Sequence, residues 1–155
     1  MAASTELIDN MKTVLADTFT MYIKAHGYHW NVIGSDFPQL HEFFQDLYEE
    51  LHGATDDIAE QIRQIDAFAP GTLQRMKELS GVAEDDKIPV AANMITNLIT
   101  ANEVLLTALM VAYKQADTDE EFGLANFLQD RMMAHKKHGW MLKATSGKKA
   151  VNTTT

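Results

Sequence analysis

The stretch FPQLHEFFQDLYEELHGATDDIAEQIRQID, residues 37–66, decides the fold. Its apolar residues recur every three or four positions, which is the repeat of an amphipathic helix with one buried face. They are Leu40, Phe43, Phe44, Leu47, Leu51, Ile58, Ile62 and Ile65. Pro38 suits the first turn of a helix, and Ala69-Pro70-Gly71 ends the pattern. The segment therefore predicts one long helix.

Three further segments carry the same repeat. The first runs from a cap at Ser4 or Thr5 to about residue 29, the next starts near Pro89, and the last covers about residues 120–143. The connection between the second and third helices is long, and residues 72–79 within it are suited to a short helix. The segment Asp117-Thr118-Asp119 both breaks the third helix and is suited to cap the fourth.

No stretch of useful length alternates with period two, so we expect an all-α protein without a sheet. Four long helices with one long crossover, which carries the short helix, indicate a four-helix bundle of the ferritin-like kind. An up-down-up-down bundle is the alternative. Residues 1–145 form one predicted domain, and the polar tail SGKKAVNTTT, residues 146–155, is expected to be flexible.

Composition excludes several classes of protein. The net charge of −9 disfavours simple electrostatic attraction to nucleic acid or anionic lipid, and it suits a protein that gathers cations. Cysteine is absent, which excludes disulfides and thiolate metal sites. The N-terminus lacks the features of a secretory signal, and no stretch approaches 18 apolar residues, so we expect a cytoplasmic protein with no membrane association.

Polar residues of the second helix suggest a metal site. Asp56 and Glu60 are four residues apart and share a face, and with His41 they supply the carboxylate and imidazole ligands of non-haem iron, or less often zinc or manganese. On a helical wheel His41, Asp56 and Glu60 lie within about 100°, on the side away from the apolar stripe. This position disfavours a metal site inside the bundle's own core.

Distance along the helix makes the site intersubunit. His41 and Asp56 are separated by 15 residues, or about 22 Å, whereas a metal–ligand bond is about 2 Å. The two cannot hold one ion within one chain. An antiparallel two-fold pairing of this helix with its copy brings His41 of one subunit to Asp56 and Glu60 of the other, twice per dimer. The competing interpretation is a solvated acidic face, since acid pairs at this spacing arise often by chance.

The run HWNVIGSDFPQLHE, residues 29–42, resembles the signature of the Dps family, or miniferritins, HWN-x-x-G-x-x-F-x-x-L-H. Residues 56–60, DDIAE, are similar to the family's D-x-x-A-E at the expected offset. The resemblance covers about residues 5–145. It implies a ferroxidase that oxidises ferrous iron, preferably with hydrogen peroxide, and stores ferric mineral inside a hollow dodecamer, protecting DNA. Some members of the family also coat DNA.

The resemblance also assigns residues. It implies that His29 and His41 are iron ligands from one subunit and that Asp56 and Glu60 are ligands from its partner. Trp30 is similar to the aromatic residue beside the centre, which intercepts stray oxidising equivalents; interface packing is its alternative role. The remaining histidines, His26, His135 and His138, are expected to be structural or surface residues, as is His52 apart from the role considered next.

One position departs from the family's pattern. Gln45 stands where the family usually has Asp, four residues after the second His, and an amide is a weaker iron ligand that does not readily bridge two ions. Asp46 points about 100° away, whereas Glu49 and His52 lie on the same face as His41 and are candidates to compensate through water. We therefore expect weaker binding at the second iron position and slower oxidation.

The acidic residues Asp117, Asp119, Glu120 and Glu121 loosely resemble the loop that lines the family's three-fold pores. A negative constriction would attract ferrous ions. A capped helix start with a solvated acidic turn is the alternative interpretation.

Two competing functions remain open from the sequence. One is a DNA-compacting protein with a secondary iron site, in which Lys143, Lys148 and Lys149 of twelve tails act together against the negative body. The other is a non-catalytic helical assembly protein. A different ferritin-like oxidase is disfavoured, because no Glu-x-x-His motif occurs on two core-facing helices.

Overall fold

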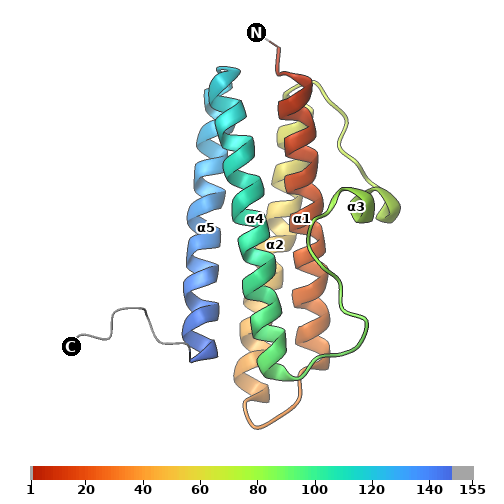
Figure 1. The fold of residues 1–155 in the computed structure, drawn as a ribbon, viewed down its shortest axis with the longest axis vertical. Helices are drawn as coiled ribbons and strands as arrows, with labels where there is room; N and C mark the ends of the chain where they lie inside the picture. The colour runs from red at the N-terminus through yellow and green to blue at the C-terminus, as the bar shows by residue number, and fades with distance from the viewer. Residues whose placement is uncertain (1, 148–155) are drawn as a thin grey trace, which may run out of the picture.

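The structure of the protein, a computed structural model, describes residues 2–147. Four long helices make up the bundle, α1 (Thr5–Asn31), α2 (Phe37–Gln64), α4 (Ala91–Thr118) and α5 (Phe122–Ser146), and the short α3 (Leu73–Leu79) lies in the connection between α2 and α4 (Figure 1). No strand occurs within residues 2–147. The prediction of an all-α bundle is confirmed.

The crossover between α2 and α4 runs the length of the bundle. In Figure 1, α2 ends at the top and α4 begins at the bottom, so α2 and α4 run in the same direction. The alternative up-down-up-down arrangement is therefore wrong. The buried carboxylate of Asp17 on α1 holds the crossover in place, since it accepts hydrogen bonds from the Gly81 backbone N–H at 2.7 Å and the Ser80 hydroxyl at 3.1 Å. Burial raises the pKa of Asp17 despite these bonds.

Helix ends differ from the sequence prediction by a few residues, because capping interactions decide them. The side chain of Ser4 caps α1 by accepting from the Leu7 N–H. Neither Asp117 nor Asp119 caps α5, whose N-cap position is Glu121 without a side-chain hydrogen bond. Asp119 instead accepts from the backbone N–H and hydroxyl of Ser4, at 2.8 and 2.6 Å, and so ties the start of α1 to the end of α4.

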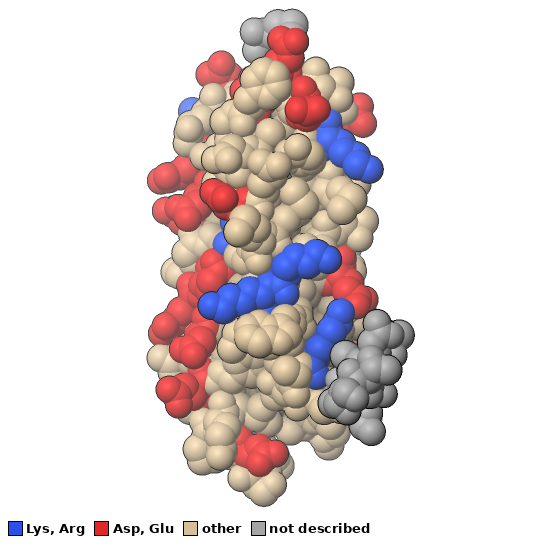
Figure 2. Space-filling model, turned by 90° about the vertical axis from the view of Figure 1, so that its left-hand side faces the viewer, with Lys and Arg blue, Asp and Glu red and all other residues tan. Residues whose placement is uncertain are grey.

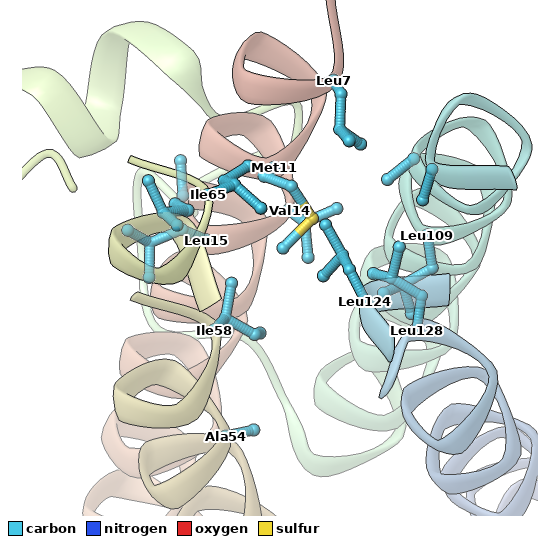
Figure 3. Close-up of a cluster of buried hydrophobic side chains, with 14 of the residues drawn as sticks. Leu7, Met11, Val14, Leu15, Ala54, Ile58, Ile65, Leu109, Leu124 and Leu128 are labelled. Carbon is cyan, nitrogen blue, oxygen red and sulfur yellow. The ribbon is translucent and has the colours of Figure 1, made fainter. Parts of the chain in front are cut away.

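The interior contains two apolar clusters. The upper one, shown in Figure 3, joins the first half of α1 and the second half of α2 to the end of α4 and the start of α5, with Leu7, Met11, Leu109, Leu124 and Leu128 among its members. The lower one surrounds Phe44 and joins the opposite halves of α1, α2 and α4. The interior also holds buried polar side chains, including Asn102, Arg131 and His135, of which Asn102 and Arg131 both contact His135.

The end of the chain departs slightly from the predicted boundary at residue 146. Ser146 is the last residue of α5, and Gly147 follows it in the left-handed conformation, with φ of 72°. The predicted flexible tail otherwise lies outside the described residues, as do Lys148 and Lys149. By length and composition α4 could cross a membrane, but it is a core helix of the bundle, with ten buried residues that include Leu98, Leu105 and Leu109.

Candidate metal centre

A pair of histidines lies where the last turn of α1 meets the first turns of α2. The imidazoles of His29 and His41 stack with their centroids 3.8 Å apart and their planes at 15°. The Nδ1 of His29 is 2.7 Å from the backbone carbonyl of His41, and the Nδ1 of His41 is 2.7 Å from the carbonyl of His29. The phenyl ring of Phe37 stacks on His41 at 5.0 Å. Both rings are therefore held in one orientation.

These two hydrogen bonds determine the protonation of the rings. A carbonyl oxygen can only accept, so each Nδ1 must donate its proton, and each Nε2 of the neutral ring keeps a lone pair. A hydrogen bond from one ring nitrogen to a backbone carbonyl is the common way in which proteins orient a metal-binding imidazole. Neither Nε2 has a partner within residues 2–147. The pair is therefore prepared to bind a cation.

The loop between α1 and α2 brings the two histidines together. Val32 is buried and its N–H donates to the Tyr28 carbonyl at 3.0 Å, and Gly34 adopts φ of 129°, a conformation that side-chain-bearing residues rarely take. The chain then enters α2 at Phe37, with proline in the first turn. The twelve-residue spacing of the histidines thus follows from one tight reversal between antiparallel helices.

Aromatic rings extend from the histidine pair along α1 and α2. His26 stacks on Tyr48 at 3.8 Å with an interplanar angle of 9°, and its Nδ1 is 3.0 Å from the Tyr22 hydroxyl. Desolvation, followed by the neighbouring His29 and His52, lowers the pKa of His26. The ring of Trp30 is 4.4 Å from His26 and 65% exposed. Trp30 therefore lies beside His26 with most of its surface exposed, and both of its expected roles stay predictions.

Asp56 and Glu60 lie exposed on the outer face of α2, far from the histidine pair in the same chain. Because α2 is one uninterrupted helix, the separation of about 22 Å between residues 41 and 56 along it stands. Within the described part of the chain, no group of three or more His, Asp or Glu side chains could hold a metal ion. The histidine pair and the acid pair are therefore separate within one chain, and a site that joins them across two subunits stays a prediction.

Three further residues of the predicted site lie on α2 between His41 and Asp56. The Gln45 side-chain amide donates to a Glu49 carboxylate oxygen at 3.0 Å. His52 is exposed, and its ring packs against that of Tyr22 with centroids 4.9 Å apart. Among residues 2–147, none of the three forms a hydrogen bond or ring contact with His29 or His41. The structure thus places Gln45, Glu49 and His52 in a row on the same outer face.

The acidic residues assigned to a pore lie at the turn between α4 and α5. Asp117 and Glu120 are exposed, and Glu120 has a positive φ of 61°. The carboxylate of Asp119 already accepts hydrogen bonds from Ser4 and from the Gln115 amide, the latter at 2.8 Å. The hydrogen bonds from Ser4 are the main reason why the pKa of Asp119 is lowered. Asp119 therefore has a structural role that the sequence prediction missed.

A second polar group, inside the bundle, was also missed. Arg131 on α5 donates to both carboxylate oxygens of Glu50 on α2, at 2.6 and 3.0 Å, and His138 lies 2.6 Å from Glu50. The fully buried His135 lies 3.0 Å from Arg131 and 2.8 Å from the Asn102 side-chain oxygen. His135 and His138 are thus structural, as expected, and Arg131 precedes His135 by one helical turn.

Burial and charge shift the pKa values of this inner group. Burial by itself would raise the pKa of Glu50, but the hydrogen bonds from His138 and Arg131 outweigh it and hold that pKa well below its ordinary value. Burial, and secondarily the positive Arg131, lower the pKa of His135 to about 3. The group therefore contains an ionised carboxylate paired with a guanidinium beside a neutral imidazole.

Comparison with known proteins agrees with this fold. The ferritin-like domain family matches residues 8–149. A DNA protection during starvation protein of Brevibacillus brevis is 33% identical over 130 residues, which are 84% of this chain and 87% of that protein. The chain belongs to the Dps branch of the ferritin-like family.

Other Dps-type proteins extend the comparison. General stress protein 20U of Bacillus subtilis is 31% identical and is matched over 93% of this chain and 99% of its own length. The crystal structure of Dps from Staphylococcus aureus superposes with a TM-score of 0.90 at 26% identity, covering 96% of this chain and all of that one. The similarity therefore extends over the whole bundle.

Proposed function

We propose that this Dps-type protein is a ferroxidase and an iron-storage and detoxification protein. Ferrous iron binds between two subunits, held by His29 and His41 of one and by Asp56 and Glu60 of the other. Hydrogen peroxide or oxygen oxidises it, and ferric mineral is kept inside a hollow homo-oligomer, which we expect to be a dodecamer. Removing ferrous iron and peroxide together protects DNA in the cytoplasm.

The observation that carries the proposal is the pair of histidines oriented by hydrogen bonds, which has no carboxylate of residues 2–147 close enough to share a metal ion. The two imidazoles supply neutral nitrogen ligands, and Asp56 and Glu60 supply the negative charge that favours Fe³⁺ over Fe²⁺. In the reaction each ferrous ion gives up one electron. Two such ions reduce one peroxide molecule, whose O–O bond breaks to give hydroxide for the ferric product. Zinc and manganese suit the same ligands and are expected competitors.

Mixing two inactive variants tests the shared site. His41→Ala removes a histidine ligand, and Asp56→Asn weakens the acid couple, so each homo-oligomer should oxidise iron at least about 100-fold more slowly than the wild type. A dimer that contains one subunit of each kind has one doubly damaged site and one intact site. Random co-assembly of equal amounts should therefore restore about a quarter of the wild-type rate.

The control is a mixture that cannot rebuild a site. His29→Ala and His41→Ala damage ligands from the same subunit, so their co-assembly should restore nothing. Subunits are mixed while unfolded and then refolded, and ferric absorbance is followed after adding peroxide to ferrous-loaded protein. Rescue in both mixtures, or in neither, would contradict a site built from two chains. A strictly monomeric form with the wild-type rate would contradict the whole proposal.

DNA compaction is the second candidate, and the surface gives it little support. Figure 2 shows the side on which α5 lies, where a few basic side chains near the middle are bordered along one edge by a column of acidic ones. With a net charge of −9 per subunit, an assembled body would repel the duplex. Gel retardation at low salt, with and without residues 145–155, tests whether the tail overcomes this repulsion.

A further inference from the structure

Glu49 and His52 form a pair of potential ligands outside the centre described above. They are one helical turn apart on the outer face of α2, at the Glu-x-x-His spacing that helix bundles use to bind metals. Both are exposed, and neither ring nitrogen of His52 has a hydrogen-bond partner within residues 2–147. The Gln45 amide holds the Glu49 carboxylate at 3.0 Å. The described part of one chain offers this pair no third ligand.

The proposed ferroxidase site determines what lies opposite this pair, and the inference rests on that proposal. If His41 meets the partner's helix between Asp56 and Glu60, the two α2 helices are antiparallel and the two-fold axis crosses each of them midway between those positions. On a continuous helix this midpoint lies at about residues 49 and 50. The centre of the dimer is therefore at Glu49 and Glu50.

The structure distinguishes these two neighbouring carboxylates. Glu50 points into the bundle, where it is paired with Arg131, so it is unavailable to a partner. Glu49 lies on the outer face with His41 and Asp56 and therefore faces the partner subunit's Glu49 across the axis. Two carboxylates brought together in this way repel each other unless a proton or a cation is shared between them.

His52 lies on the same outer face, about 4.5 Å along the helix from Glu49. In the antiparallel register it comes within about two residues of the position opposite the partner subunit's Glu49. Its ring rests on Tyr22 of α1, which restricts the directions in which its free nitrogens can point. Helices in contact are about 8–10 Å apart, a distance that one ion with ligands from both sides can bridge.

We propose that two Glu49 carboxylates and two His52 imidazoles bind one divalent transition-metal ion on the two-fold axis of each dimer. Two nitrogen and two oxygen ligands suit a borderline cation such as Fe²⁺, Co²⁺ or Zn²⁺. Glu49 is eight residues from His41, about 12 Å along the helix, so it does not replace the family's missing Asp at position 45. The axial ion is separate from the ferroxidase ions and links the two subunits.

Cobalt titration of the assembled protein tests the axial site. Equilibrium dialysis against Co²⁺ without oxidant, followed by metal analysis, gives the number of ions per dimer. His52→Ala and Glu49→Gln should each bind one ion per dimer fewer than the wild type, and their remaining sites should show the wild-type affinity. The matched control is Asp57→Asn, an exposed acid outside this face, which should bind the wild-type number.

The same measurement separates the two proposals. His41→Ala should lose the ferroxidase ions and keep the axial ion. If His52→Ala and Glu49→Gln, both shown to be assembled, bind as many ions as the wild type, the axial site does not exist, while the ferroxidase proposal stands. If His41→Ala keeps every ion and the His52 variant loses one, the ferroxidase assignment is wrong. The proposed axial site is then overturned as well, because the antiparallel register of the two α2 helices was derived from that assignment.

Discussion

Glu49 and Glu50 are neighbours in the sequence, but they belong to regions of opposite kind. Glu50 is part of the inner polar group, in which Arg131, His138, His135 and Asn102 are linked by hydrogen bonds within one chain. Glu49 belongs to the outer face of α2, whose His41, Asp56 and Glu60 have ligand atoms without partners in the described part of the chain. The inner group pairs its charges within one chain, whereas in the proposed function the outer face is completed by a metal ion and another subunit.

This difference separates structural polar residues from functional ones. A buried charge must be paired within the folded chain, because burying an unpaired charge costs free energy of desolvation. An exposed ligand set avoids that cost because water solvates it until a cation arrives. We therefore expect substitutions in the inner group to change stability and substitutions on the outer face to change iron chemistry.

Removing the guanidinium of Arg131 should have the largest effect on folding. Arg131→Leu leaves the half-buried Glu50 without its guanidinium partner and the buried imidazole of His135 without its contact to Arg131, so the free energy of unfolding should fall by about 3 kcal/mol. Urea denaturation at fixed subunit concentration measures it. Glu49→Gln is the matched control on the outer face, and without metal it should stay within about 0.5 kcal/mol of the wild type. Equal losses of unfolding free energy in both variants would contradict the difference between the inner group and the outer face.

Lowering the pH should have the second-largest effect, because it reduces the contribution of the inner group to the free energy of unfolding. His135 has a pKa of about 3 in the folded protein, and about 6.5 when unfolded. Between these values the unfolded chain binds more protons, so stability falls as the pH drops through this range. The lowered pKa of Glu50 adds a loss of the same sign below its ordinary pKa.

The change should amount to about 1 kcal/mol per pH unit between pH 6 and pH 4. His135→Gln lacks the buried titrating ring, so its unfolding free energy should depend less steeply on pH over the same interval, although the protein is less stable at pH 7. Urea denaturation at each pH gives both curves. Parallel curves for the two proteins would show that His135 is not the responsible group.

On the outer face, Gln45→Asp should increase the rate of ferrous iron oxidation. A carboxylate at this position adds a ligand that can bridge two ions, so we expect oxidation to be about tenfold faster, equivalent to about 1.4 kcal/mol. Stopped-flow ferric absorbance measures the rate, and dialysis measures the ferrous stoichiometry. Asp46→Asn, one residue away and off this face, is the control. An unchanged rate and stoichiometry in Gln45→Asp would mean that the amide is no handicap.

The smallest effects are expected at the turn between α4 and α5, where the two kinds of role are mixed. Asp119→Asn weakens the hydrogen bonds to Ser4, so it should lower stability by about 1 kcal/mol. Asp117→Asn should leave stability unchanged, and it should slow iron uptake only if this loop lines an entry pore. The rate of iron uptake and the denaturation curve of Asp117→Asn are each compared with those of the wild type. Slower uptake at unchanged stability would support the pore role.

Much of the candidate centre could be predicted from the sequence. The spacing of His41, Asp56 and Glu60 on one helix already excludes a site within one chain, because the rise of a helix is constant. The pairing of His29 with His41 through each other's backbone carbonyls was not predictable, since it depends on how closely two antiparallel helices approach. The same holds for Arg131, whose partner Glu50 is 81 residues away in the sequence.

The periodicity of four apolar stripes by itself determined that the protein is a helical bundle, and the polar residues of α2 predicted a metal site on the face away from the core. Only the tertiary structure decided the direction of the crossover, the role of Asp119 and the ion pairs inside the bundle. Periodicity is a property of local backbone geometry, whereas these features depend on which side chains meet after distant segments have packed together.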